Sequence, residues 1–96
     1  MSLLHNERIF RYLTRWIVCG VHTAEPVCAL TFDDGPSRRH TPRLLDQLEQ
    51  HDCRATFFVL GKHVHCSPHL LKRIAAGGHE IGNHTYHHPY LTLCPT

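Results

Sequence analysis

Two short stretches of this sequence carry side chains that could bind a metal ion. The stretch HEIGNHTYHHPYL contains four histidines, and two of them, His84 and His88, are four residues apart. That spacing places both side chains on one face if the segment forms a helical turn. The stretch TFDDGPS contains the adjacent carboxylates Asp33 and Asp34. Zinc and similar divalent ions accept imidazole nitrogen and carboxylate oxygen together, so His84, His88 and Asp34 could form a two-histidine, one-carboxylate site.

The residues beside these candidate ligands have two interpretations each. Asp33 either acts as a general base that takes a proton from water beside the ion, or only helps to form an Asx-type turn before the Gly-Pro that follows. Asn83 and Thr85 either support the site by orienting His84 and its backbone, or simply cap the local turn. In a chain with eleven histidines, the pair His84 and His88 could also be a solvated surface pair.

The other histidines are expected outside the ligand set. His79 precedes the last predicted strand, and His87 should point away from the face that His84 and His88 share. Three more are expected on the surface near the start of a helix: His63, His65 and His69.

Three apolar runs predict the strands that position these side chains. We expect strands at residues 27–32 and 55–60 and a short strand within residues 79–85. Continuous apolar runs that stop at glycine or proline are typical of strands buried on both faces of a parallel sheet. The aspartates end the first of these strands and the histidine stretch follows the third.

Two helices are expected between these strands. Each begins with a hydroxyl residue followed by proline, the pattern of an N-cap and a first helical position. We expect one helix from Thr41 to about His51 and another from Ser67 to Gly77. Strands and helices that alternate with short loops predict an α/β fold, in which helices cover a parallel sheet. Ligands in such folds bind beyond the carboxyl ends of the strands, where the aspartates and histidines would meet.

The N-terminal residues predict a separate element. Residues 6–21 have an apolar stripe at helical spacing, with arginines on another face. This amphipathic helix either packs on the rest of the fold or binds a membrane surface or a partner. We therefore divide the chain into residues 1–25, the helix and a linker, and residues 26–96, the domain that carries the candidate site.

The composition predicts one small globular domain. The 96 residues are 42% hydrophobic and 19% charged, with a formal net charge of +2. The basic residues form no run, so nucleic acid is not an expected partner, and no apolar stretch approaches the eighteen or so residues of a membrane span. No clean signal-peptide cleavage site follows the N-terminal apolar run. The five cysteines include no C-x-x-C pair, and we expect them to be reduced, with the two in or beside strand-like runs buried.

Three stretches resemble the opening half of the polysaccharide deacetylases of carbohydrate esterase family 4: TFDDGPS, ATFFVLG and GHEIGNHTYHHPYL. The resemblance implies a distorted (β/α) barrel that removes N- or O-acetyl groups from chitin, peptidoglycan or xylan with a divalent metal ion, zinc above all, or cobalt or another ion. In the first motif it assigns Asp33 as the catalytic base and Asp34 as a metal ligand. In the second it assigns His84 and His88 as the other ligands, with Thr85 in support.

This sequence also departs from the family pattern. The family continues to an R-x-P-Y segment and a late histidine that acts as general acid, and neither occurs here. Because such a barrel needs about 200 residues or more, we expect this chain to be the N-terminal part of a longer enzyme. Otherwise, an oligomer or a partner chain would cover the open edges of its short sheet. The alternative is a truncated, non-catalytic remnant that binds metal or glycan.

Overall fold

The structure, a computed structural model, describes residues 20–95. The predicted helix at residues 6–21 lies outside these residues, apart from its last two positions, which are irregular. No described helix is long and apolar enough to cross a membrane. In chain order the elements are β1 (Thr31–Gly35), α2 (Thr41–Gln50), β2 (Thr56–Val59), α3 (Gly61–Cys66), α4 (Pro68–Ala76), β3 (Glu80–Asn83) and the 3-10 helix η3 (Leu91–Leu93).

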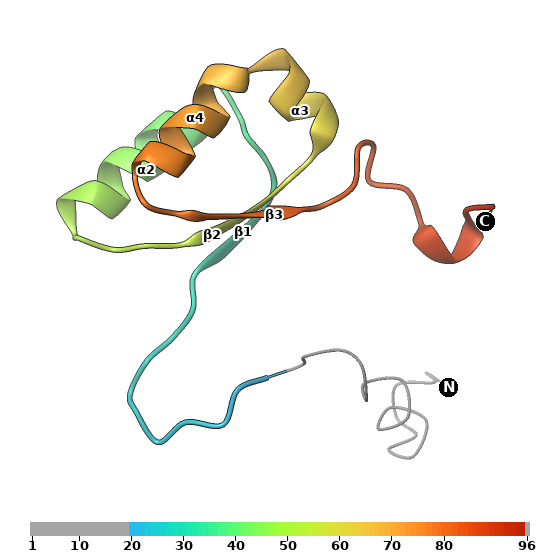
Figure 1. Cartoon of the computed structure of the whole chain (residues 1–96). Helices are drawn as coiled ribbons and strands as arrows, with labels where there is room; N and C mark the ends of the chain where they lie inside the picture. The colour runs from blue at the N-terminus through green and yellow to red at the C-terminus, as the bar shows by residue number, and fades with distance from the viewer. Residues whose placement is uncertain (1–19, 96) are drawn as a thin grey trace.

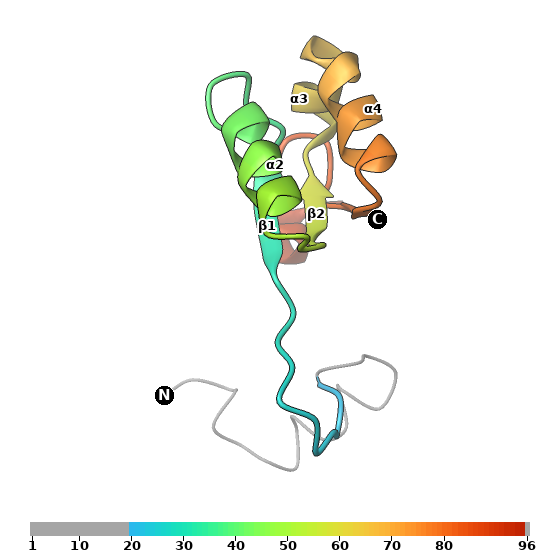
Figure 2. The ribbon, with the colours of Figure 1, turned by 90° about the vertical axis from the view of Figure 1, so that its left-hand side faces the viewer.

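The three strands form one parallel sheet in the order β1-β2-β3, which confirms the predicted α/β fold (Figure 1). Helices α2, α3 and α4 lie on the same side of this sheet, as Figures 1 and 2 show together. The register pairs Phe32 with Phe57 and Phe57 with Ile81, so one apolar residue from each strand lies in a single row. The carboxyl ends of all three strands consequently meet at one rim.

The core lies between the sheet and two of the helices. α2 and α4 each turn one apolar face toward β2, the central strand, and Ile74 of α4 is fully buried. Burial of such faces is the main favourable term in the folding of a small domain. The buried core residues are Leu45, Leu48, Ala55, Phe57, Val59 and Ile74.

β1 differs from its prediction. It begins at Thr31 rather than at residue 27, continues through both aspartates to Gly35, and is largely exposed. The apolar residues before it are exposed too, with 65% of Val27 and 43% of Leu30 accessible to solvent. The prediction of a strand buried on both faces was wrong here because, within residues 20–95, helices cover only one side of the sheet and β1 lies at its edge.

The two predicted helices are confirmed, with one correction to a cap. α2 and α4 both carry proline in their first turn. Thr41, however, is already helical, and the N-cap of α2 is His40. The hydroxyl of Thr41 instead accepts a hydrogen bond from the backbone N–H of Ser37, at 2.8 Å, and so closes the turn after β1.

Two further features differ from the predictions. The second strand ends before Gly61, as predicted, but a six-residue helix that was not predicted, α3, begins at Gly61. The cysteines in or beside the strand-like runs, Cys28 and Cys53, are exposed. Cys28 lies in the irregular segment before β1 and Cys53 in the turn after α2, so neither side chain belongs to the row that faces the helices.

Candidate metal centre

Three predicted side chains meet at the carboxyl rim of the sheet. Asp34 lies near the end of β1, His84 directly follows β3, and His88 lies four residues further on. The Oδ1 atom of Asp34 is 3.2 Å from Nε2 of His84 and 3.5 Å from Nε2 of His88. One ligand atom from each residue can be chosen so that all three lie within 4.8 Å of one another.

These separations suit a divalent ion of the size of zinc. Ligands at about 2.0–2.1 Å in a tetrahedron lie roughly 3.3 Å from one another, close to both measured distances. The side chains are also open on one side, since solvent reaches 31% of His84, 58% of His88 and 61% of Asp34. Three protein ligands with an accessible side are typical of catalytic zinc sites, whereas structural sites are closed by four protein ligands. Asp34, His84 and His88 therefore fit a divalent metal ion such as zinc, which the sequence predicted here.

A β-bulge at Asp34 lets two consecutive carboxylates approach the same imidazole. In a regular strand Asp33 and Asp34 would point to opposite faces. Here the register passes from the pair Asp33 and Phe58 to the pair Gly35 and Val59, so Asp34 has no partner on β2. Its φ of 70° is in the left-handed region, which is uncommon for a residue with a side chain. The bulge turns the Asp34 carboxylate back toward the rim.

Asp33 lies beside the three candidate ligands but outside their set. Its Oδ2 atom is 4.0 Å from Nε2 of His84, and solvent reaches 56% of its side chain. An accessible carboxylate next to a cation site can accept a proton from water there. Asp33 therefore lies beside the candidate ligands, and its role as a general base stays a prediction.

The loop after β3 does not form the helical turn that the spacing suggested. Residues 84 and 85 have no regular secondary structure and residues 86 and 87 form a bend. Thr85 and His88 have φ angles of 71° and 60°. The rings of His84 and His88 nevertheless meet edge to face, with centroids 4.9 Å apart. The two rings lie together as expected, but two left-handed residues bring them together rather than helical geometry.

Asn83 and Thr85 hold the backbone of this loop. The Oδ1 atom of Asn83 accepts the N–H of Thr85 at 2.8 Å, and Oγ1 of Thr85 accepts the N–H of His88 at 2.9 Å. Both bonds are of the side chain-to-backbone kind that stabilises turns. Asn83 and Thr85 were expected either to orient His84 and its backbone or to cap the turn. The structure shows hydrogen bonds to the backbone of the turn that carries His84 and His88.

Most of the remaining histidines lie away from the site. His79 packs edge-on against Phe57, and its Nδ1 accepts the backbone N–H of Ala55. His87 packs edge to face against the ring of Tyr86. His65 and His69 are exposed on the helical side of the molecule, as predicted.

His63 is the residue near the site that sequence reasoning missed. It was expected to be an ordinary surface residue, yet it is half-buried, with its Nδ1 atom 2.6 Å from the backbone oxygen of Asp34. Nothing in the local pattern GKHVHC indicates this contact, because it depends on α3, which was not predicted.

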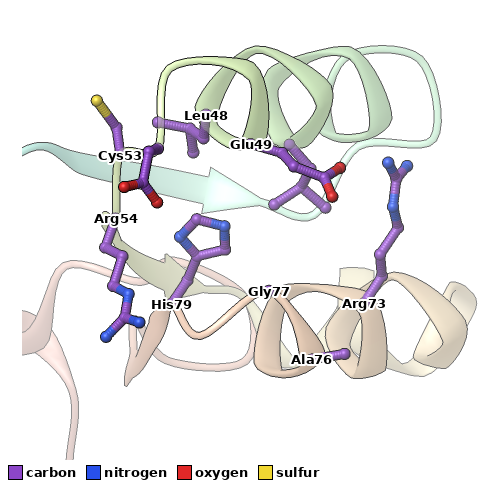
Figure 3. A pocket seen from close by; sticks show the side chains of 10 residues that line it. Leu48, Glu49, Cys53, Arg54, Arg73, Ala76, Gly77 and His79 are labelled. Carbon is purple, nitrogen blue, oxygen red and sulfur yellow. The ribbon is translucent and has the colours of Figure 1, made fainter.

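A pocket lies at the opposite end of the strands from this cluster, between the last turns of α2 and α4 (Figure 3). Its walls carry charges of both signs and include Glu49, Asp52, Arg54, Arg73 and His79. It faces the amino ends of the strands, where α/β folds hold stabilising rather than catalytic residues. The candidate catalytic residues are therefore those at the carboxyl ends of the strands.

A parallel α/β unit with imidazole and carboxylate groups at the carboxyl ends of its strands has the arrangement found in (β/α)-barrel proteins. Comparison with known proteins identifies the family within that class. Residues 20–96 match the sequence profile of the family described as polysaccharide deacetylase. The chain belongs to the polysaccharide deacetylase family.

Individual relatives agree with this assignment. The chain is 59% identical over 63 residues to a peptidoglycan-N-acetylglucosamine deacetylase of Bacillus cereus, an alignment that covers 66% of this chain and 23% of the relative. It is 49% identical over 72 residues to a chitooligosaccharide deacetylase of Sinorhizobium fredii, covering 75% and 34%. The solved structure of the peptidoglycan deacetylase PdaC from Bacillus subtilis superposes with a TM-score of 0.69 at 48% identity, covering 70% of this chain and 33% of that one.

These comparisons also define how much of the fold is present. The structural neighbours include a chitin deacetylase and a family 4 carbohydrate esterase, whose family has a (β/α)-barrel fold. This chain has the fold of the N-terminal part of such a barrel. It spans about a third or less of the length of the relatives described above.

Proposed function

We propose that this chain carries the metal-binding side of a deacetylase active site, within an enzyme that hydrolyses acetyl groups of an acetylated polysaccharide. The observation that supports this most directly is the meeting of Asp34, His84 and His88, whose ligand atoms lie within 4.8 Å of one another. Membership of the polysaccharide deacetylase family supports deacetylation as the reaction at this cluster.

Asp34, His84 and His88 would hold the ion. When bound, a divalent ion supplies Lewis acidity, which polarises an acetyl carbonyl and makes a water molecule more acidic. Zinc suits two nitrogens and one carboxylate oxygen, and cobalt or another divalent ion could replace it. The accessible side of the cluster leaves room for the substrate.

Asp33 would act as the general base. Hydrolysis adds the oxygen of water to the carbonyl carbon of an acetamide, and the proton lost from that water goes to the Asp33 carboxylate. The bond between carbonyl carbon and nitrogen then breaks, which releases acetate and leaves an amine on the sugar. The nitrogen must gain a proton as it leaves, and no residue of this chain is assigned that role. With an acetyl ester the leaving atom is oxygen, and the role of Asp33 is the same.

The substrate class follows from the relatives. Their names specify N-acetylglucosamine in peptidoglycan and chitooligosaccharides, so we propose an acetylated glycan of this kind, with acetylated xylan as a less direct candidate. An exposed rim suits a long polymer, because the reacting sugar can enter while its neighbours remain outside. Residues 26–96 would form this part of the barrel, and residues 1–25 a separate helix and linker. We further propose that the outer edges of β1 and β3 are covered by further strands, by an oligomer or by a partner chain.

Calorimetric titration with zinc tests the first part of the proposal, that Asp34, His84 and His88 bind a metal ion. We expect about one equivalent to bind to the purified chain and no site-specific binding to the His84→Ala variant. His87→Ala is the matched control, because His87 is a neighbouring histidine outside the candidate ligand set. If His87→Ala lowered the affinity as much as His84→Ala, the assignment of ligands would be wrong. Acetate release from chitooligosaccharide or peptidoglycan, measured on the same samples, then separates an enzyme from a protein that only binds metal.

A further inference from the structure

Four consecutive residues at the start of α3 hold both segments that carry the candidate ligands. Three of them use backbone N–H groups, and the fourth uses a side chain. The bonds are Leu60 N–H to Gly35 O at 2.9 Å, Gly61 N–H to Thr85 O at 2.9 Å, Lys62 N–H to Tyr86 O at 3.2 Å, and His63 Nδ1 to Asp34 O at 2.6 Å. Two bonds therefore reach the end of β1 and two reach the loop after β3.

His63 contributes the only side chain among these four contacts. Because the backbone oxygen of Asp34 can only accept, Nδ1 of His63 must carry the proton and donate it. Among residues 20–95, the ligand atoms that lie within 4.8 Å of one another belong to Asp34, His84 and His88, and His63 is outside this group. The imidazole of His63 thus contacts a candidate ligand residue through its backbone rather than through its carboxylate.

The backbone that His63 contacts is the part of β1 that the sheet supports least. Asp34 is the bulged residue, without a partner on β2, and its φ is 70°. A left-handed residue with a side chain persists only where surrounding contacts hold it. Rotation of this peptide would move Oδ1 of Asp34 away from the two imidazole nitrogens, which lie 3.2 and 3.5 Å from it.

We propose that His63 is a positioning residue of the metal centre: its Nδ1–H bond to the Asp34 carbonyl keeps the bulge in the conformation that directs the Asp34 carboxylate toward His84 and His88. This inference rests on the proposed function, since it concerns the same metal site. It adds a residue outside the ligand set and a role for α3, the helix that connects the two ligand-bearing segments.

Zinc calorimetry on three variants tests this role. In His63→Ala the bond is lost, and we expect the dissociation constant for zinc to rise about 10- to 100-fold, the usual effect of losing a group that orients a ligand. In His63→Asn the side-chain amide can donate from nearly the same place as Nδ1, so we expect most of the affinity to return. His65→Ala is the matched control, because it removes an exposed imidazole from the same helix, and its affinity should equal that of the parent.

The visible absorption spectrum of the cobalt-loaded chain gives a second readout, because it reports the geometry around the ion. We expect the spectrum to change in His63→Ala and to match the parent in His63→Asn and His65→Ala. Thermal unfolding followed by circular dichroism shows that each variant is folded. If His63→Ala is unfolded, His63→Asn and His65→Ala still test the proposal. Parent-like affinity and spectrum in His63→Asn support it. Weaker binding in folded His63→Asn overturns it.

The outcomes separate this inference from the function on which it rests. If the parent binds zinc, His84→Ala does not, and folded His63→Ala binds as tightly as the parent with an unchanged cobalt spectrum, His63 has no positioning role and the metal site stands. If affinity falls in His63→Ala and does not return in His63→Asn, the hydrogen bond is not the cause and the inference fails. A parent chain without site-specific zinc binding overturns the proposed function, and this inference with it.

Discussion

Nε2 of His84 lies 3.2 Å from Oδ1 of Asp34, although Asp34 is part of β1 and His84 follows β3, the strands at opposite edges of the sheet. Two strand spacings separate β1 from β3, or about 10 Å. The bulge at Asp34 and the loop after β3 close this gap by turning both side chains over the end of β2. Formation of the candidate site therefore requires both strand pairings to be in register, as well as the two irregular segments.

Replacing the two aspartates should have separable effects. We expect Asp34→Ala to abolish site-specific zinc binding, because it removes a candidate ligand, and Asp33→Ala to retain it. Where the parent releases acetate, Asp33→Ala should lower the rate by about 10²- to 10⁴-fold, the usual contribution of a general base. Calorimetry and an acetate assay on the same preparations measure both quantities. Acetate release that survives Asp33→Ala would rule out Asp33 as the base.

Thr85→Val tests the support of His88. The variant keeps the shape of the side chain but removes the oxygen that accepts the His88 N–H at 2.9 Å. We expect about a tenfold weaker affinity for zinc, typical of losing a group that orients a ligand. Thr85→Ser keeps the hydroxyl and serves as the control. Equal affinity in Thr85→Val and Thr85→Ser would show that the hydrogen bond does not position His88.

Gly82→Ala should destabilise the fold. A Cβ atom at residue 82 would collide with the ring of Phe58, which lies across this glycine from the neighbouring strand. Overpacking of this kind typically lowers the free energy of unfolding by about 1–3 kcal/mol. Gly20→Ala is the matched control, because a Cβ there meets nothing within 4 Å. Urea denaturation measures both variants, and a loss of stability that Phe58→Leu does not relieve in the double variant would contradict this explanation.

Ile74→Ala should be more damaging, because Ile74 has no exposed surface. Truncation of a buried isoleucine to alanine costs about 2–5 kcal/mol, from lost burial and from the cavity that remains. Leu93→Ala is the control, since 81% of Leu93 is exposed. Chemical denaturation of the two variants should give clearly different midpoints, and similar midpoints would show that α4 does not pack as described.

The sequence predicted most of the regular structure because its patterns are local. Proline after a hydroxyl residue indicated the first turns of α2 and α4, and the apolar run around Phe57 and Val59 indicated the central strand. α3 was missed because its sequence begins with glycine and has neither a polar cap nor a clear apolar face. The exposed state of Val27 could not be predicted, since a strand's burial depends on neighbours that its own sequence does not contain.

For the candidate site, residue types were predictable and geometry was not. The sequence identified Asp34, His84 and His88, and the structure brings these three together; their role as ligands stays a prediction. No pattern in TFDDGPS indicates that Asp34 is bulged, because a bulge is defined only by the register with β2. The contact between His63 and the backbone oxygen of Asp34 could not be predicted for a similar reason. It joins residues 29 positions apart and depends on a helix that was not predicted.

The exposed apolar side chains have a consequence for how the chain behaves in the laboratory. Among residues 20–95, eight large ones are at least 40% accessible: Val21, Val27, Leu30, Ile81, Tyr86, Tyr90, Leu91 and Leu93. Fluorescent dyes that report on denaturation do so by adsorbing to such surface. The folded chain should therefore already increase the fluorescence of these dyes at low temperature. A shallow melting curve from such an assay would then reflect a high starting fluorescence rather than a disordered protein.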